Sequence, residues 1–442
     1  MKLWAGLVLN LFSAAVCAAQ DQLPPMTLEQ AVSEAYAANR LLKASELEAM
    51  KSQDLLAAAK TLHLPQFKVY GMASRTFDPV TFTVPKGSLG VVPPLGLFPT
   101  ADMSITAAND IYGAVAGMVT MPVSQHYKIN MAVEARRLQS TASYQELRLR
   151  RQEVRGAVEQ LFYGILQAQS GIEAASLMEK AAHDALADME NYRSEKAALE
   201  SDYYRVKARF LRAKYDRGRA EDALADLKRK LNNALGRSLE SPLELAPLFE
   251  PTEKDIPPEA GQYASGARPD VLRAAARAGQ AGYDAKIKKA EYIPDLNLTV
   301  NYLRFINTSY IPQNISGAGL MLSWDIFDWG RRGHELDERN RTAQQAQKLL
   351  LEEERKAEID LRAGRAALLE TFELVGVASA ERQAAAEARR VAEDKFAEHA
   401  ILPKELYAAR AAAAESELNY RKALADFYEA RTRYLHASGE DL

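Results

Sequence analysis

The sequence predicts an internally duplicated chain in which pairs of β-strands alternate with very long α-helices. Three observations predict this class. Between residues 319 and 333, apolar residues at every second position give way to a composition rich in Ala, Glu, Gln, Arg and Leu, so a strand leads directly into a helix. From Arg331 to His399 there is no proline, so this helix is far longer than a globular core needs. The same order of elements occurs twice, at one constant spacing.

The first 19 residues have the pattern of a secretory signal peptide. Lys2 precedes an apolar stretch that ends in small residues, and cleavage is expected after Ala19. The stretch is too short to serve as a membrane anchor. The only cysteine, Cys17, lies inside it. A lipidated Cys17 is the alternative, although Val16 does not fit the usual context of a lipidation site. The mature chain therefore uses neither disulfides nor thiol chemistry.

Composition narrows the function classes. The chain has 56 basic and 59 acidic residues and a net charge of −3, so nucleic acid is not expected as a partner. The mature part contains no run of about 18 apolar residues, so no transmembrane helix is expected, although an exported chain can also cross a membrane as a β-barrel. The six histidines form no metal-binding pair, and no phosphate loop or nucleophile elbow is present. We therefore expect no enzyme activity, no cofactor and no metal site.

The first repeat is predicted to span residues 20–240. A helix is expected over 28–62, because Thr27 and Gln30 have the spacing of a capping box and Pro65 ends the segment. A strand pair follows within 66–122, interrupted by a Pro- and Gly-rich loop at 85–100. Two antiparallel helices of about 60 and 40 residues then fill 125–236 and turn near residues 191–202.

A proline-rich connector, residues 241–267, separates the two repeats. The second repeat, 268–442, begins with a helix and continues with a strand pair at 294–327 and long helices over 331–437. Its first strand alternates strictly between apolar and polar residues, as in a ribbon with one lipid-facing and one water-facing side. The apolar positions are Leu296, Leu298, Val300 and Tyr302, and the polar ones are Asn297, Thr299 and Asn301.

These anchors together resemble the TolC family of outer-membrane efflux channels, the outer membrane factors. The resemblance covers essentially the whole mature chain. It rests on the helix starts at Asn39 and Arg268, the strand starts after Pro65 and Pro294, the sequence WDIFDWGRR at 324–332, and LNNALG at 231–236. It implies a homotrimer with four strands from each protomer, forming a 12-stranded membrane β-barrel that continues as a long α-helical barrel, a tunnel through the periplasm.

Elementary physics also demands an oligomer. About four strands cannot close a barrel around a lumen, and open strand edges are not tolerated in lipid. Three copies give an even-stranded barrel, and helices of about 60 residues reach ~90 Å, the length of a tunnel wall.

The resemblance also implies candidate site residues. A gate at the periplasmic mouth falls on Glu405 and on Asp202. The family usually has a glycine in each helix turn that receives a periplasmic adaptor, and here Glu195 and His399 stand at those places. The expected adaptor-contact residues are Glu195, Lys196, Ala197, Leu199, His399, Ala400, Ile401 and Leu402.

Each of these assignments has a structural alternative. Glu405 and Asp202 could be solvated surface carboxylates. Trp324, Phe327 and Trp329 could belong to a core, but their place at a strand end favours an aromatic belt at the membrane interface.

The sequence leaves three functions open. The first is an outer-membrane exit duct for small toxic compounds, loaded by an inner-membrane pump and a periplasmic adaptor protein. The second is the same duct in a type I protein secretion system. The third is a periplasmic coiled-coil scaffold without a pore, against which the alternation at 296–302 argues, because a scaffold needs no strand that faces outer-membrane lipid.

Overall fold

The structure is a computed structural model that describes residues 25–78, 80–196, 199–259, 264–308, 312–398 and 400–440. The predicted signal peptide with Cys17, and two of the expected tip residues, Ala197 and His399, lie outside this part of the chain.

The chain divides into two compact units, and each draws on both predicted repeats. Unit 1 takes in the described residues up to Asn39, Val154–Asp255 and Glu370–Glu429. Unit 2 takes in Arg40–Glu153, Ile256–Leu369 and the described residues from Ala430 onward. The repeat boundaries at 20–240, 241–267 and 268–442 remain predictions.

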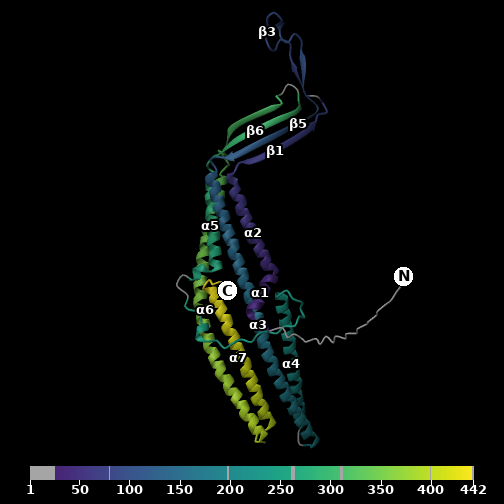
Figure 1. Cartoon of the computed structure of the whole chain (residues 1–442), viewed down its shortest axis with the longest axis vertical. Coiled ribbons are helices and arrows are strands. Elements are labelled where there is room, and N and C mark those ends of the chain that lie inside the picture. Colours follow the sequence, from purple (N-terminus) through teal and green to yellow (C-terminus); the bar gives the residue numbers. More distant parts are fainter. Residues whose placement is uncertain are drawn as a thin grey trace, which may run out of the picture. The chain divides into compact units, whose positions relative to one another are not determined.

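Unit 2 contains a five-stranded antiparallel sheet. Its long strands are β1 (Gln66–Arg75), β5 (Met103–Pro122), β6 (Asp295–Thr308) and β7 (Asn314–Ser323), in the order β1-β5-β6-β7. The short β2 (Val80–Val84) pairs with β5 after a register shift. Figure 1 shows β1, β5 and β6 side by side.

Two strand predictions need correction. The second strand pair ends at Ser323 and not at residue 327, because Asp295, its last partner on β6, directly follows Pro294, which has no backbone N–H to continue the ladder. In the first pair, the predicted loop at 85–100 contains a small hairpin of β3 (Val91–Val92) and β4 (Gly96–Leu97).

The helix expected over 28–62 is broken in the structure. The helix α1 (Leu28–Ala38) begins at the predicted capping box, with Gln30 N–H donating to Thr27 Oγ1 at 3.3 Å and Thr27 N–H to Gln30 Oε1 at 3.0 Å. It ends at Asn39, whose ψ of 115° is extended and lets no helix continue. The chain resumes as α2 (Arg40–Lys60) and ends in a short 3-10 turn, η1 (Thr61–His63).

The remaining helices confirm the duplicated order. α3 (His126–Ser194) and α4 (Glu200–Ala234) have 69 and 35 residues, and α6 (Arg331–Ala397) and α7 (Pro403–Ala437) have 67 and 35. α5 (Pro269–Ala290) has 22 residues, against 21 for α2. The predicted turn near 191–202 is confirmed. Among the described helices, none is long and apolar enough to cross a membrane.

The core of unit 1 lies where α1 packs with parts of α3, α4 and α7. Its fully buried members include Ala31, Phe162, Ile165 and Leu231. One buried cation lies beside this core, since the Arg155 guanidinium donates to Glu159 at 2.8 Å and to Glu29 at 2.7 Å. Burial of a charge is tolerated only with such partners.

Candidate functional site

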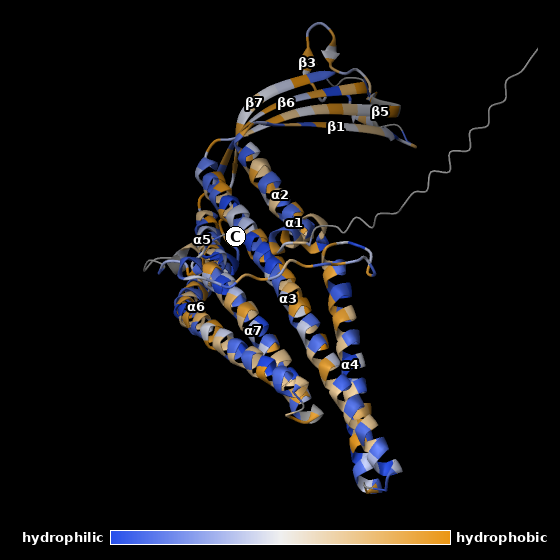
Figure 2. Cartoon of the chain, turned by 60° about the horizontal axis from the view of Figure 1, so that its bottom comes forward, coloured by the Kyte–Doolittle hydropathy of each residue, from blue (hydrophilic) through white to orange (hydrophobic). Residues whose placement is uncertain are grey.

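The sheet of unit 2 has one apolar and one more polar face. The register aligns Phe67, Val119, Val300 and Ala318 in one row across all four long strands. The next row holds Gln66, Thr120, Thr299 and Gly319. Neighbouring rows point to opposite sides of a sheet, so in these two rows the apolar side chains lie on one side and the polar ones on the other. Figure 2 shows hydrophobic and paler residues along the strands.

The apolar face is exposed in the single chain. Phe67 is 77% exposed, Leu320 67% and Val300 46%. Apolar surface of this extent requires an apolar environment or a partner. Both faces are mixed. Arg75 and Arg304 lie on the apolar side, near the end of the sheet that is distant from the helices. The other side also carries apolar residues, namely Met72, Met118, Leu303, Phe305, Ile315 and Met321.

Both edges of this sheet are open. Among the described residues, β1 pairs only with β5, and β7 pairs only with β6. Each edge therefore carries a row of backbone groups without a strand partner, which lipid does not tolerate and which pairs readily with another chain. The long strands have 10 to 20 residues, at least the length that crosses a bilayer as a tilted strand.

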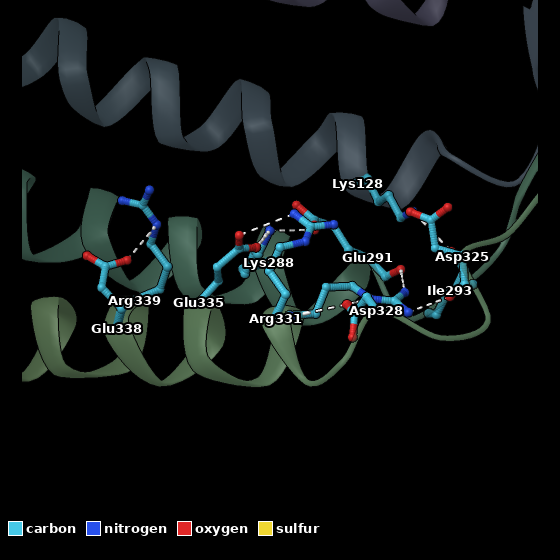
Figure 3. Close-up of polar contacts among 11 residues, drawn as sticks. Lys128, Lys288, Glu291, Ile293, Asp325, Asp328, Arg331, Glu335, Glu338 and Arg339 are labelled. Atoms are coloured by element: carbon cyan, nitrogen blue, oxygen red, sulfur yellow. Dashed lines mark hydrogen bonds and ion pairs between the residues drawn. The ribbon is translucent and has the colours of Figure 1, made fainter.

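A charged cluster joins the sheet to the helices (Figure 3). Asp328 caps α6 by accepting from Gly330 N–H and Arg332 N–H, both at 3.1 Å. The Arg332 guanidinium donates to Asp328 at 2.5 Å and also to the Asp325 carbonyl. The hydrogen bond from Arg332 holds the pKa of Asp328 below its usual range. The residues that carried the sequence resemblance thus fix the strand-to-helix transition.

The same cluster ties α5 to α6. Lys288 forms ion pairs with Glu335 at 2.5 Å and with Glu291 at 2.6 Å, and Arg331 pairs with Glu335 at 3.2 Å. On the first turn of α3, Lys128 donates to the Ile293 carbonyl at 3.1 Å. These contacts hold the start of each long helix against the strand ends.

The three aromatic candidates follow the last strand. Trp324, Phe327 and Trp329 are 52, 72 and 89% exposed, so none belongs to the core of the single chain. Phe327 and Trp329 pack edge to face at 4.9 Å. Their assignment to a membrane interface stays a prediction.

In the turn between α3 and α4, the residue that follows Glu195, the expected glycine position, adopts a strained backbone conformation. Lys196 has φ +56°, in the left-handed region that favours glycine, and its N–H bonds to the Arg193 carbonyl at 3.0 Å. Arg193 pairs with Glu200 at 2.7 Å and lies 4.4 Å over the Tyr203 ring, which closes the turn. Glu195 is exposed, and Leu199 is 70% exposed at the very end.

The turn between α6 and α7 presents a second exposed leucine. Ala400 N–H returns to the Lys395 carbonyl at 2.8 Å and closes α6. Ala400 is exposed, Ile401 is half-buried and Leu402 is 55% exposed. We call the antiparallel pairs α3–α4 and α6–α7 helix hairpins. The described adaptor-contact residues thus lie at the turns of these two helix hairpins, and their role remains a prediction.

The two gate candidates occupy equivalent places. Asp202 and Glu405 each lie in the first turn of the helix that follows a hairpin end, α4 and α7. Glu405 is exposed, whereas Asp202 is half-buried and pairs with Arg205 at 2.7 Å. An acidic residue in a first turn also stabilises its own helix. The Arg205 partner makes Asp202 the weaker of the two candidates.

A contact between the two hairpins was missed from the sequence. The Tyr407 hydroxyl on α7 donates to the Asp184 carboxylate on α3, and this bond holds the pKa of Asp184 below its usual range. The same bond raises the pKa of Tyr407. The two residues are 223 positions apart, and no periodicity marks either one.

Among the described residues, no group of three or more His, Cys, Asp or Glu side chains is arranged to hold a metal ion.

With this geometry in place, comparison with known proteins shows the fold. No protein-family model matches the chain, and no curated protein matches it in sequence. The CmeC outer membrane channel of Campylobacter jejuni superposes with a TM-score of 0.77 at 14% identity, covering 93% of this chain and 85% of CmeC. The outer membrane protein VceC of Vibrio cholerae gives 0.72 at 12% identity, covering 93% and 96%. The open MtrE outer membrane channel of Neisseria gonorrhoeae gives 0.70 at 16% identity, covering 94% and 89%.

The chain therefore has the fold of outer-membrane channel proteins. This finding confirms the predicted fold class and agrees with the resemblance drawn from the sequence.

Proposed function

We propose that three copies of the chain form an outer-membrane channel, and that this channel is the passive, gated exit duct of a tripartite efflux system for small toxic compounds. One observation carries the proposal. A sheet with an apolar face and two open edges runs directly into helices of 69 and 67 residues. A pore-less scaffold would need neither the apolar face nor the open edges.

Closure follows from the sheet order. If β1 of one copy pairs with β7 of the next, three copies join twelve long strands without a free edge. The row containing Phe67 and Val300 then faces lipid, and the row containing Gln66 and Thr299 faces water. Helices of this length extend the duct by ~100 Å into the periplasm.

We place the proposed gate at the turns between α3 and α4 and between α6 and α7, where Asp202 and Glu405 lie. Threefold symmetry brings three Glu405 carboxylates, and less strongly three Asp202 carboxylates, around one axis. A ring of like charges in a narrow, water-filled opening concentrates cations. The Tyr407–Asp184 bond holds α7 on α3, so we assign it to the closed state, and opening requires that it break.

The exposed ends of the hairpins are proposed to receive the adaptor. Leu199 and Leu402 are large apolar side chains at the tips of otherwise charged helices. They fit the central contacts of a docking site, with Glu195 and Lys196 at its polar rim. The adaptor in turn brings the inner-membrane pump.

The test is purification from outer membranes in mild detergent, followed by planar-bilayer recording. We expect an unheated complex with the mass of three chains and single-channel currents that favour cations. A complex of one chain, or a trimer without conductance, would contradict the channel. Deletion of the gene should also raise the sensitivity of cells to small toxic compounds, and a loss of one secreted protein instead would favour the secretion alternative.

A further inference from the structure

The segment between β2 and β5 folds into an apolar hairpin, and the proposed channel function does not explain why it is apolar. We use the name apolar hairpin for residues 86–102. From residue 87 to residue 101 it carries no charged side chain. Its large apolar residues are exposed in the single chain, namely Leu89 at 64%, Val91 at 68%, Leu95 at 64%, Leu97 at 52% and Phe98 at 39%.

The apolar hairpin is an ordered structure. Gly87 N–H bonds to the Pro99 carbonyl at 2.9 Å, Leu89 N–H to the Phe98 carbonyl at 3.1 Å, and Phe98 N–H to the Gly90 carbonyl at 2.8 Å. At its base, Lys86 N–H bonds to Asp102 Oδ1 at 2.7 Å.

Glycines fix this shape. Gly87 and Gly90 have φ of +76° and +93°, and a Cβ on Gly87 would meet the Leu97 side chain at 3.2 Å. The backbone of the segment therefore holds its leucines and valines in exposed positions. An exposed apolar surface of this kind indicates a contact site.

The position of the apolar hairpin indicates its partner. β5 begins at Met103, directly after the hairpin, and ends at Pro122 near the helices, so the hairpin lies at the opposite end of the sheet. Figure 1 shows β3 beyond that end. Every copy that joins the sheet through its open edges brings one hairpin to the same mouth.

The charge pattern favours identical copies as the partner. Identical surfaces that meet on a symmetry axis repel one another if they carry charge. The apolar hairpin carries none between its two base residues, Lys86 and Asp102, which have opposite signs. An anionic lipid surface would instead be matched by clustered basic residues, and the hairpin has only Lys86.

We propose that the apolar hairpins of three copies pack against one another over the outer mouth and narrow it. This inference rests on the proposed trimer, and it goes further, because it assigns a constriction at the far end of the sheet in addition to the proposed gate at Glu405 and Asp202.

The test uses single cysteines, because the predicted mature chain has none. Leu95→Cys at the hairpin tip is oxidised in intact cells and compared with Gln313→Cys, which lies in the β6–β7 loop at the same end of the sheet and outside the hairpin. If the tips meet, Leu95→Cys gives disulfide-linked dimers containing about two thirds of the chains, since one disulfide joins two of three symmetric thiols. Gln313→Cys should react with an impermeant thiol reagent and stay monomeric.

A second variant tests the constriction. The double substitution Val91→Lys and Leu95→Lys places like charges on the packed surface. Single-channel conductance should therefore rise while the unheated trimer persists. The matched control, Val91→Ser with Leu95→Ser, should change the conductance less. A trimer that gives neither the cross-link nor the rise would overturn the hairpin contact and leave the proposed channel intact. Quenching of a fluorophore on Leu95→Cys by a lipid-borne quencher would assign the hairpin to lipid and also overturn it. Failure to form any trimer would instead defeat the proposed function.

Discussion

The two halves of the chain have long helices of nearly equal length, but they differ in two added segments. Helices of 69 and 35 residues in the first half correspond to 67 and 35 in the second. Among the described residues, only the first half has a helix such as α1 in front of α2, and a segment such as the apolar hairpin between β2 and β5. The duplicated lengths are what a closed wall requires, whereas the additions occur where the chain can vary without disturbing pairing.

The halves also anchor their helices differently. In the first half, the buried Arg155 reaches Glu159 within α3 and Glu29 on α1. In the second, Arg268 before α5 pairs with Asp270 at 2.6 Å and with Asp360 on α6 at 3.1 Å. Burial acts to raise the pKa of Asp270, but the hydrogen bonds from Arg268 outweigh it and the pKa is lowered. Both halves thus use an arginine, but only the first buries it together with its partner.

The largest effect is expected for Arg155→Ala. It leaves Glu159, whose side chain is 3% exposed, in the interior without the cation, which costs about 3–5 kcal/mol. The measurement is the free energy of unfolding, or the dissociation temperature of the trimer. Arg150→Ala is the control, since its pair with Glu153 is exposed and its loss should cost ~1 kcal/mol or less. Equal effects of the two substitutions would contradict the anchoring role of Arg155.

Arg268→Ala should destabilise the second half by a smaller amount. Its partners Asp270 and Asp360 are more exposed than Glu159, so solvent can replace the lost hydrogen bonds in part, and about 1.5–3 kcal/mol is expected. Arg268→Lys should recover only a fraction, because lysine cannot reproduce the forked contact with Asp270. The two arginine variants in one protein should show nearly additive losses, and strong coupling between them would argue against two independent anchors.

The Tyr407–Asp184 contact joins the helix pairs of the two halves. Tyr407→Phe removes the hydroxyl and keeps the ring, so we expect a higher open probability in bilayers with little change in trimer stability. Tyr192→Phe, at an exposed position near the end of α3, is the matched control. If both variants open equally seldom, the bond does not hold the closed state.

Acid should weaken the same contact. The pKa of Asp184 is lowered in the folded protein. The contribution of the ionised Asp184 to stability is therefore fully present above the unfolded-state pKa of about 3.9, and it is lost as the pH falls through the lower pKa of the folded state. Open probability should therefore rise only below about pH 4, and Tyr407→Phe should reduce this response. An unchanged acid response in Tyr407→Phe would assign the titration to another group.

The smallest effect on structure is expected for the acidic ring. In the proposed trimer, Glu405→Ala removes three solvated charges, so cation selectivity and block by trivalent cations should fall while stability stays nearly unchanged. Asp202→Ala should do less, because Arg205 already neutralises part of its charge. If the two substitutions combined leave selectivity and block as in the parent, both carboxylates belong to the outer surface.

The sequence predicted the features that depend on periodicity. The alternation at 296–302 gave the two faces of the sheet, and the proline-free runs gave the long helices. Periodicity predicted one helix over 28–62 and missed the break at Asn39, because helix-forming residues lie on both sides; only the resemblance placed a helix start there.

Features that depend on tertiary contact stayed hidden. The apolar hairpin requires positive φ at Gly87 and Gly90 within a segment that resembles an irregular loop. The Tyr407–Asp184 bond joins two helices through residues with no shared pattern. The place of a turn could be predicted at 191–202, but not that Lys196 would adopt the conformation usual for glycine.

The most direct test of the central claim is a disulfide scan between the two open edges. Within one chain, β1 and β7 are separated by β5 and β6, about 14 Å across the sheet, which is beyond the reach of a disulfide. Val69→Cys on β1 would be combined in turn with single cysteines at positions 316–320 on β7 and oxidised in membranes. We expect covalent dimers and trimers for at least one combination, because each β1 is proposed to pair with the β7 of a neighbour. Monomers alone across the whole scan, from protein that still runs as an unheated trimer, would show that the sheet does not close in this way.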